Sequence, residues 1–179
     1  AHPDPAAIEA AAELLLTARR PVIVAGGGAI TANASDALTA LAERLGAAVS
    51  ITWNGKGAIA EDNALFIGAV GQTGTTCGNQ ITASADVVIS VGCRFTDWSA
   101  SSYAKGVSFS FPPGKLIHID LDPREIGKTY PTEVGIVADA KIGWQLPGLS
   151  LMRKAELSLA INNLFDRHYR EQHVGGRDN

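Results

Sequence analysis

Three consecutive glycines that follow an apolar run are the first candidate site for chemistry. The run spans residues 22–25, and Gly26, Gly27 and Gly28 come directly after it. A buried strand that leads into glycines is typical of turns that bring backbone N–H groups close to a nucleotide phosphate. The same pattern also fits a turn that only connects a strand to a helix and binds nothing. Both interpretations stay open at this point.

The fingerprint for dinucleotides, G-x-G-x-x-G, is matched only in part. Gly26 and Gly28 occupy its first two glycine positions, but the third falls on Thr31. The fingerprint also requires an acidic residue about 20 residues further on, for the ribose hydroxyls. Here the next apolar run ends in Thr52, Trp53 and Asn54, without a carboxylate. These two departures disfavour a free-standing NAD-dependent enzyme.

Other reactive side chains do not form a recognisable catalytic pattern. Lys56 stands between two glycines, but the spacing G-x-x-x-x-G-K and a following Ser or Thr are missing, which excludes a P-loop. Ser101, Ser102 and His118 show no triad spacing, and His118 alternates with apolar residues as a sheet residue would. We therefore predict no catalytic residue.

The elements that must position the glycines are apolar strands alternating with helices. The predicted strands cover residues 22–25, 47–52, 86–91, 115–120 and 135–138. The predicted helices cover residues 6–18, 35–45 and 75–84, with a helical turn from Asp122, and residues 54–57 and 92–114 form loops. This order predicts an α/β fold, with a doubly wound, mostly parallel sheet of about five or six strands and helices on both faces.

Composition narrows the class of protein. The chain has 179 residues, of which 46% are apolar and 18% are charged, as expected for one globular domain with an appendage. A net charge of -3 without a basic cluster argues against nucleic acid and anionic membranes as partners. Cys77 and Cys93 lack metal-site spacing and predict a reduced pair in a cytoplasmic protein. Without an initiating methionine or a signal peptide, we expect a fragment or a processed chain.

Five motifs in a fixed order resemble the central domain of thiamine-diphosphate-dependent enzymes, in particular the acetolactate synthase-like group. They are "PVIVAGGGAI", "ITWNGKGAIAED", "GAVGQTGTTCGNQ", "ADVVISVGCRFTDW" and "KLIHIDLDPREIGKTYPTEVGIVADAK". The resemblance covers residues 3–141, so we expect one domain over 1–141 and a separate appendage over 142–179.

The resemblance implies a Rossmann-like domain that binds FAD in some members, an adenine nucleotide in others, and nothing in the rest. Its FAD is largely structural. The implied cofactor-binding positions are Gly26, Gly27, Gly28, Thr52, Gly71, Gly74, Arg94, Asp120, Glu125, Ile126 and Asp139.

Individual roles follow from the same resemblance. The glycine turn would approach the nucleotide, Thr52 and the loop 68–74 would line the flavin side, and residues 125–126 and 139–140 would frame the adenine. Arg94 would bind a phosphate, since guanidinium offers paired donors, and Asp120 would accept from ribose hydroxyls.

Structural alternatives exist for the charged residues of this set. Arg94 could instead pair with Asp97, three residues further on, or with Asp120, which ends another predicted strand at the same edge of the sheet. Asp120 and Asp122 are also suited to capping the turn that follows them, because Asp122 precedes Pro123.

The resemblance further implies that catalysis needs flanking domains. Those thiamine-binding domains supply the activating glutamate and the Gly-Asp-Gly magnesium motif, and "GDG" does not occur in this sequence. We expect thiamine diphosphate and magnesium only in a parent enzyme, a carboligase or lyase, with the flanking domains as partners. The alternative is a structural or assembly module that binds no ligand.

Residues 142–179 depart from the family pattern. The stretch "AELSLAINNLFDRHYRE", residues 155–171, resembles a C-terminal strand of TonB-dependent outer-membrane receptors. Its apolar residues fit both a strand and a helix, and its composition favours a helix. A lone barrel strand leaves its backbone unpaired in lipid, so we expect no membrane function. We predict a chimera whose appendage covers the sheet or promotes homo-oligomerisation.

Overall fold

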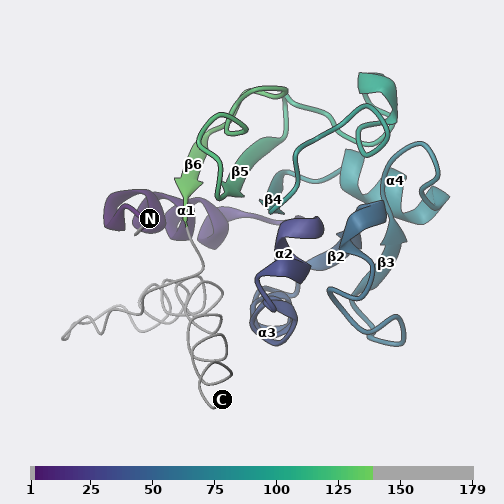
Figure 1. The fold of residues 1–179 in the computed structure, drawn as a ribbon, viewed down its shortest axis with the longest axis horizontal. Helices are drawn as coiled ribbons and strands as arrows, with labels where there is room; N and C mark the ends of the chain where they lie inside the picture. The colour runs from purple at the N-terminus through teal and green to yellow at the C-terminus, as the bar shows by residue number, and fades with distance from the viewer. Residues whose placement is uncertain (1–2, 139–179) are drawn as a thin grey trace, which may run out of the picture.

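The computed structural model describes residues 3–138, which form a six-stranded parallel sheet flanked by helices (Figure 1). The strand order is β3-β2-β1-β4-β5-β6, and every neighbouring pair is parallel. The strands are β1 (Pro21–Ala25), β2 (Ala48–Ile51), β3 (Phe66–Ala69), β4 (Val87–Val91), β5 (Lys115–Asp120) and β6 (Val134–Val137). The predicted doubly wound α/β fold is confirmed.

Within residues 3–138 one α-helix precedes β1, two follow β1 and one follows β3. They are α1 (Pro5–Thr17), α2 (Gly27–Thr31), α3 (Ser35–Leu45) and α4 (Thr76–Ala83), with short 3-10 turns η1 (Trp53–Gly55) and η2 (Ser101–Tyr103). The Asp4 side chain accepts a hydrogen bond from the Ala6 N–H and so caps α1. Helix α3 ends where Gly46 adopts a left-handed φ of 59°, which costs little without a Cβ.

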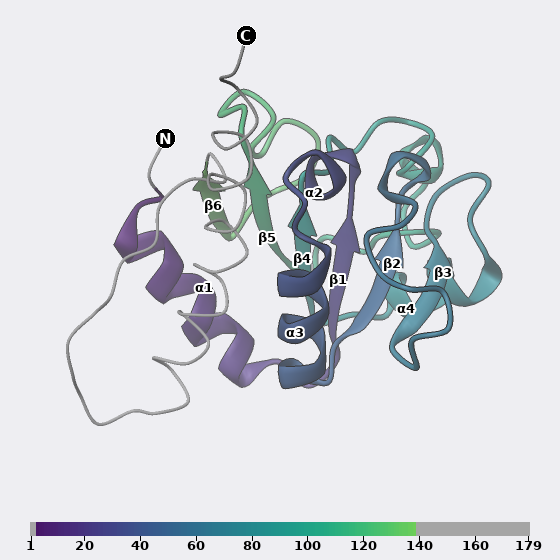
Figure 2. The ribbon, with the colours of Figure 1, turned by 60° about the horizontal axis from the view of Figure 1, so that its bottom comes forward.

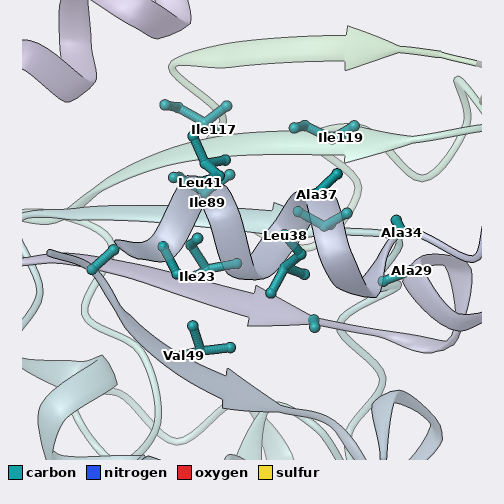
Figure 3. Packing of buried hydrophobic residues seen from close by; sticks show 14 of the residues in the cluster. Ile23, Ala29, Ala34, Ala37, Leu38, Leu41, Val49, Ile89, Ile117 and Ile119 are labelled. Carbon is teal, nitrogen blue, oxygen red and sulfur yellow. The ribbon is translucent and has the colours of Figure 1, made fainter. Parts of the chain in front are cut away.

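Apolar side chains form one packed layer on each face of the sheet. On one face α1 and α3 lie against the strands, as Figure 2 shows, and Leu38 and Leu41 of α3 pack with Ile23, Ile89 and Ile117 (Figure 3). Because successive side chains of a strand point to opposite faces, the neighbours of these isoleucines form the second layer. That layer joins Val22, Val24, Val88 and Leu116 to the aromatic residues Phe95 and Phe109.

The strand order creates a switch point between β1 and β4. The chain runs outward from β1 through β2 to β3, then returns to β4 and runs outward in the other direction through β5 to β6. The connections that leave β1 and β4 therefore diverge, and ligands of such sheets bind outside the carboxyl ends at this position. In Figure 2 helix α2 lies at the carboxyl end of β1, directly beside that position.

The predicted strands and helices appear within two residues of their expected bounds. Strand β3 was not among the predicted strands. The appendage 142–179 lies outside the described residues, as does Asp139. Within residues 3–138 no helix has both the length and the apolar character that a membrane crossing requires.

Candidate functional site

A cavity of about 1170 Å³ lies along the carboxyl edge of the sheet. Its walls come from the segments that follow β1, β2, β3, β4 and β5. Five of the predicted site residues line it together: Gly27, Gly28, Thr52, Arg94 and Asp120. Large apolar side chains that also line the cavity are partly exposed to solvent, namely Ile30, Trp53, Trp98 and Leu121.

The glycine turn packs against a fourth glycine. The Gly26 N–H donates to the Val91 carbonyl at 2.9 Å, and the Gly28 N–H donates to the Gly92 carbonyl at 3.0 Å. A Cβ on Gly26 would lie 2.1 Å from the Gly92 oxygen, closer than any side chain tolerates. Two of the three glycines are thus required by contact between the loops after β1 and β4, and only Gly27 and Gly28 line the cavity.

The segment after β2 closes over the end of β1 in a similar way. The Thr52 N–H donates to the Ala25 carbonyl at 2.9 Å, and a Cβ on Gly55 would lie 2.0 Å from the same oxygen. This close approach places Thr52 and Asn54 on the cavity wall. It also leaves the Trp53 side chain 79% exposed at the rim.

Arg94 follows β4 and presents a solvent-exposed guanidinium to the cavity. Among residues 3–138 no carboxylate lies within the 4.0 Å of an ion pair with Arg94, so the alternative pairing with Asp97 or Asp120 is not found. The cation is therefore available to a ligand.

Asp120 ends β5 with its carboxylate buried against the following turn. Its Oδ1 accepts a hydrogen bond from the Asp122 N–H at 3.0 Å, while its Oδ2 accepts none from the described residues. Asp122 accepts from the Arg124 N–H and forms a two-pronged ion pair with the Arg124 guanidinium. These hydrogen bonds from Arg124 lower the pKa of Asp122 to about 2. The capping interpretation holds for both aspartates, and Asp120 still has one oxygen to offer.

The remaining predicted residues lie outside the cavity lining. Gly71 adopts a left-handed φ of 112° against the Trp98 backbone, and Gly74 packs on the Ala69 carbonyl. Glu125 pairs with Lys128, and Ile126 packs against Gly135 of β6. The expected role of Gly71 and Gly74 on the flavin side stays a prediction, as does that of Glu125, Ile126 and Asp139 around the adenine.

Two reactive groups, Cys93 in the cavity lining and His118 next to it, are held in inert forms. His118 is buried and its Nε2 lies 3.0 Å from the Cys93 carbonyl, which fixes the proton on Nε2. Burial lowers the pKa of His118 and raises the pKa of the Cys93 thiol to about 11. Within the described ranges no group of three His, Cys, Asp or Glu side chains is placed to hold a metal ion.

Sequence reasoning missed part of this site. Gly92 stands in "SVGC", directly after a predicted strand, and its position after β4 was the available signal. Trp53 and Trp98 occur within two of the five family motifs, but the exposure of their side chains depends on how the loops fold. Nothing in the local pattern indicated Leu121.

Comparison with known proteins adds three findings. Residues 8–146 match the family model described as "Thiamine pyrophosphate enzyme, central domain". The chain is 43% identical over 137 residues to a probable acetolactate synthase large subunit of Methanocaldococcus jannaschii, with 76% of this chain and 22% of that protein covered. It is 40% identical over 162 residues to the acetolactate synthase large subunit of Parasynechococcus marenigrum, with 88% and 24% covered.

A third relative is named for a different activity. The glyoxylate carboligase of Escherichia coli O157:H7 is 41% identical over 136 residues, with 75% of this chain and 22% of that protein covered. The chain therefore spans less than a quarter of the length of each of these relatives.

Proposed function

Because the chain belongs to the family of thiamine pyrophosphate enzyme central domains, we propose that it is the non-catalytic central domain of an acetolactate synthase-like enzyme, with a site for FAD or another adenine nucleotide. The observation that carries the proposal is that Arg94 and Asp120 share one cavity at the switch point of the sheet. An unpaired cation and a carboxylate oxygen are the groups that a nucleotide's phosphate and ribose require.

The residues of the cavity fit such a ligand. Its volume of about 1170 Å³ is larger than the roughly 300–1000 Å³ of common small-molecule pockets, which suits a dinucleotide. Trp53 and Trp98 offer aromatic surface to a planar ring, and Gly27 and Gly28 bring backbone to the cavity wall. FAD bound here would serve a structural role, with Arg94 holding a phosphate and Asp120 orienting a ribose.

We assign no chemical step to this domain. Cys93 is a protonated, buried thiol, and His118 is a neutral imidazole bonded to backbone. In the proposal, thiamine diphosphate and magnesium bind to flanking domains of the parent enzyme, which is a carboligase or lyase, and those domains are its partners. The free cysteines Cys77 and Cys93 support a cytoplasmic location, and oligomerisation through residues 142–179 stays a prediction.

A specific observation favours a second candidate, a structural module without a ligand. The packing of Gly26 and Gly28 on Gly92 accounts for those glycines without any nucleotide. In that case the other domains of the parent enzyme would cover the residues that line the cavity, and no ligand would stabilise the domain.

The experiment that separates the candidates is a titration of the purified 179-residue chain with FAD, ADP and NAD. We expect FAD or ADP to raise the melting temperature, since a ligand at about 100 times its Kd adds about 2.7 kcal/mol to the free energy of unfolding. FAD absorbance should survive desalting if binding is tight. No shift with either ligand would favour the structural module, and a shift with NAD alone would favour a dehydrogenase.

A further inference from the structure

The side-chain amide of Asn79 clamps a loop beside the cavity. Asn79 belongs to α4, and its Nδ2 donates to the Gly71 carbonyl at 3.0 Å while its Oδ1 accepts from the Gly71 N–H at 2.9 Å. One amide therefore satisfies both backbone polar groups of a single residue. This pairing also fixes the orientation of the Asn79 amide, because the reverse orientation would set two donors against each other.

A second branch leads from Asn79 to the segment after β4. Because Oδ1 can only accept, the Ser108 hydroxyl must donate to it, at 2.7 Å. The Ser108 proton is then used, so the Ser101 hydroxyl donates to Ser108 at 2.5 Å. The result is a directed chain, buried at Ser101 and Ser108, that ends on Asn79.

The anchored segment has an unusual backbone. Ser101, Ser102 and Tyr103 are three consecutive non-glycine residues with left-handed φ angles of 49°, 52° and 61°. Each such residue costs about 1–2 kcal/mol, and runs of them are rare. The turn persists because neighbouring structure holds it, through the Ser101 hydroxyl and through a hydrogen bond from the Gln72 side chain to Ser102.

One branch contacts the Trp98 backbone, and the other holds the turn that begins three residues after Trp98. The Gln72 N–H donates to the Trp98 carbonyl at 2.8 Å, and Gly71 approaches the same carbonyl so closely that a Cβ would lie 2.3 Å from it. The left-handed turn follows Trp98 in the chain, so Trp98 is held from the loop before α4 and from its own C-terminal side. Trp98 itself lines the cavity with its side chain 61% exposed.

We propose that Asn79 is a positioning residue that fixes Trp98 on the cavity wall and thereby sets the affinity of the cavity for a nucleotide. The affinity part rests on the proposed function, whereas the positioning of Trp98 does not. Asn79 contacts no ligand in this proposal; it acts through Gly71, Gln72 and the turn at Ser101.

The test combines two readouts on the full chain. Trp98 fluorescence is isolated in a background in which Trp53 and Trp144 are replaced by phenylalanine, and FAD binding is titrated in the native background. In Asn79→Ala we expect a red-shifted Trp98 emission, stronger quenching by acrylamide and an FAD Kd raised about tenfold. Ser108→Ala removes one branch only and serves as the milder variant if Asn79→Ala does not fold.

Asp86→Ala is the matched control. The Asp86 carboxylate accepts hydrogen bonds from the Arg19 and Arg20 N–H groups at the amino end of the sheet, away from the cavity. This variant should lose stability while its Trp98 signal and FAD affinity stay unchanged. Equal Trp98 signals in the unsubstituted, Asn79→Ala and Ser108→Ala chains would overturn the positioning role.

The remaining outcomes are also decisive. A changed Trp98 signal with an unchanged FAD Kd would overturn the affinity part alone. If the unsubstituted chain binds neither FAD nor ADP, the proposed function fails and the affinity part fails with it. The fluorescence comparison then still decides whether Asn79 positions Trp98.

Discussion

Gly28 and Gly92 meet backbone to backbone at the carboxyl edge of the sheet. The Gly28 N–H donates to the Gly92 carbonyl at 3.0 Å, and a Cβ on either glycine would lie 2.5 or 2.6 Å from the Cα of the other. The loops after β1 and β4 therefore pack so closely at this point that neither glycine can be replaced by a residue with a side chain. Gly28 and Gly92 both line the cavity, together with Gly27 and Arg94 from the same two loops.

The first prediction concerns this contact between Gly28 and Gly92. Gly92→Ala places a Cβ against Gly28 at a left-handed φ of 60°, so we expect a loss of about 3 kcal/mol in the free energy of unfolding. Gly46→Ala is the control, because Gly46 has nearly the same φ of 59° but no heavy atom within 4 Å of the added Cβ. It should lose only about 1 kcal/mol. Urea denaturation measures both, and equal losses would contradict the packing argument.

The second prediction concerns the free cation of the cavity. Arg94→Gln removes the only positive charge that residues 3–138 contribute to the cavity lining, so we expect the FAD Kd to rise at least about tenfold and to depend less on salt. Arg124→Gln is the control, since the Arg124 side chain is engaged by Asp122 and lies outside the lining. Calorimetric titration compares the two. An unchanged affinity in Arg94→Gln would remove Arg94 from the site.

The third prediction follows from the buried imidazole. Burial lowers the pKa of His118 in the folded chain, so the unfolded chain binds the proton more readily. The stabilisation by neutral His118 is complete above its unfolded pKa of about 6.5 and is lost as the pH falls from there towards the folded pKa. The midpoint of urea unfolding should therefore decrease between pH 7.5 and 5.5. His118→Asn should show a flatter pH profile in that window, and the same slope in both chains would assign the effect elsewhere.

The fourth prediction concerns Asp86, which acts at a lower pH. Burial raises its pKa, but the hydrogen bonds from the Arg19 and Arg20 N–H groups outweigh burial, so the pKa lies below the usual value. The carboxylate stabilises the fold above its unfolded pKa of about 3.9, and this contribution disappears as the pH falls through the folded pKa. At pH 7, Asp86→Ala should cost about 1–2 kcal/mol. At pH 2.5 the difference from the unsubstituted chain should be much smaller, and a cost independent of pH would exclude the charge as the cause.

The sheet was predictable to the extent that its strands are buried on both faces. Strands β1 and β4 are buried along nearly their whole length, and such strands appear as continuous apolar runs that define their own limits. Strand β3 lies at an edge and all four of its residues are only half-buried. The apolar run over residues 64–70 contains it, but Gly68 interrupts that run and was predicted to begin a loop. The place of β3 becomes evident only from its pairing with β2.

The candidate site was predictable where parallel strands alone determine position. Arg94 and Asp120 come together because β4 and β5 are neighbours and end at the same edge. The role of Gly92 was not predictable, since it depends on contact between two loops far apart in the chain. The turn after β5 folds towards β6, where Ile126 meets Gly135, and this tertiary contact takes residues 125–126 away from the cavity lining.

The strand order has a consequence for how the domain is synthesised. Strand β1 is synthesised before one of its two neighbours, β4, which follows only after β2, β3 and α4. The nascent chain must therefore carry an unpaired, wholly apolar strand edge until that partner arrives, and non-local parallel pairing of this kind forms slowly. The cavity walls are completed later still, because their last lining residue, Ala138, follows β6. A chaperone can therefore bind the exposed apolar edge of β1 during synthesis, whereas a ligand of the cavity meets a complete site only once nearly all of the described residues have been translated.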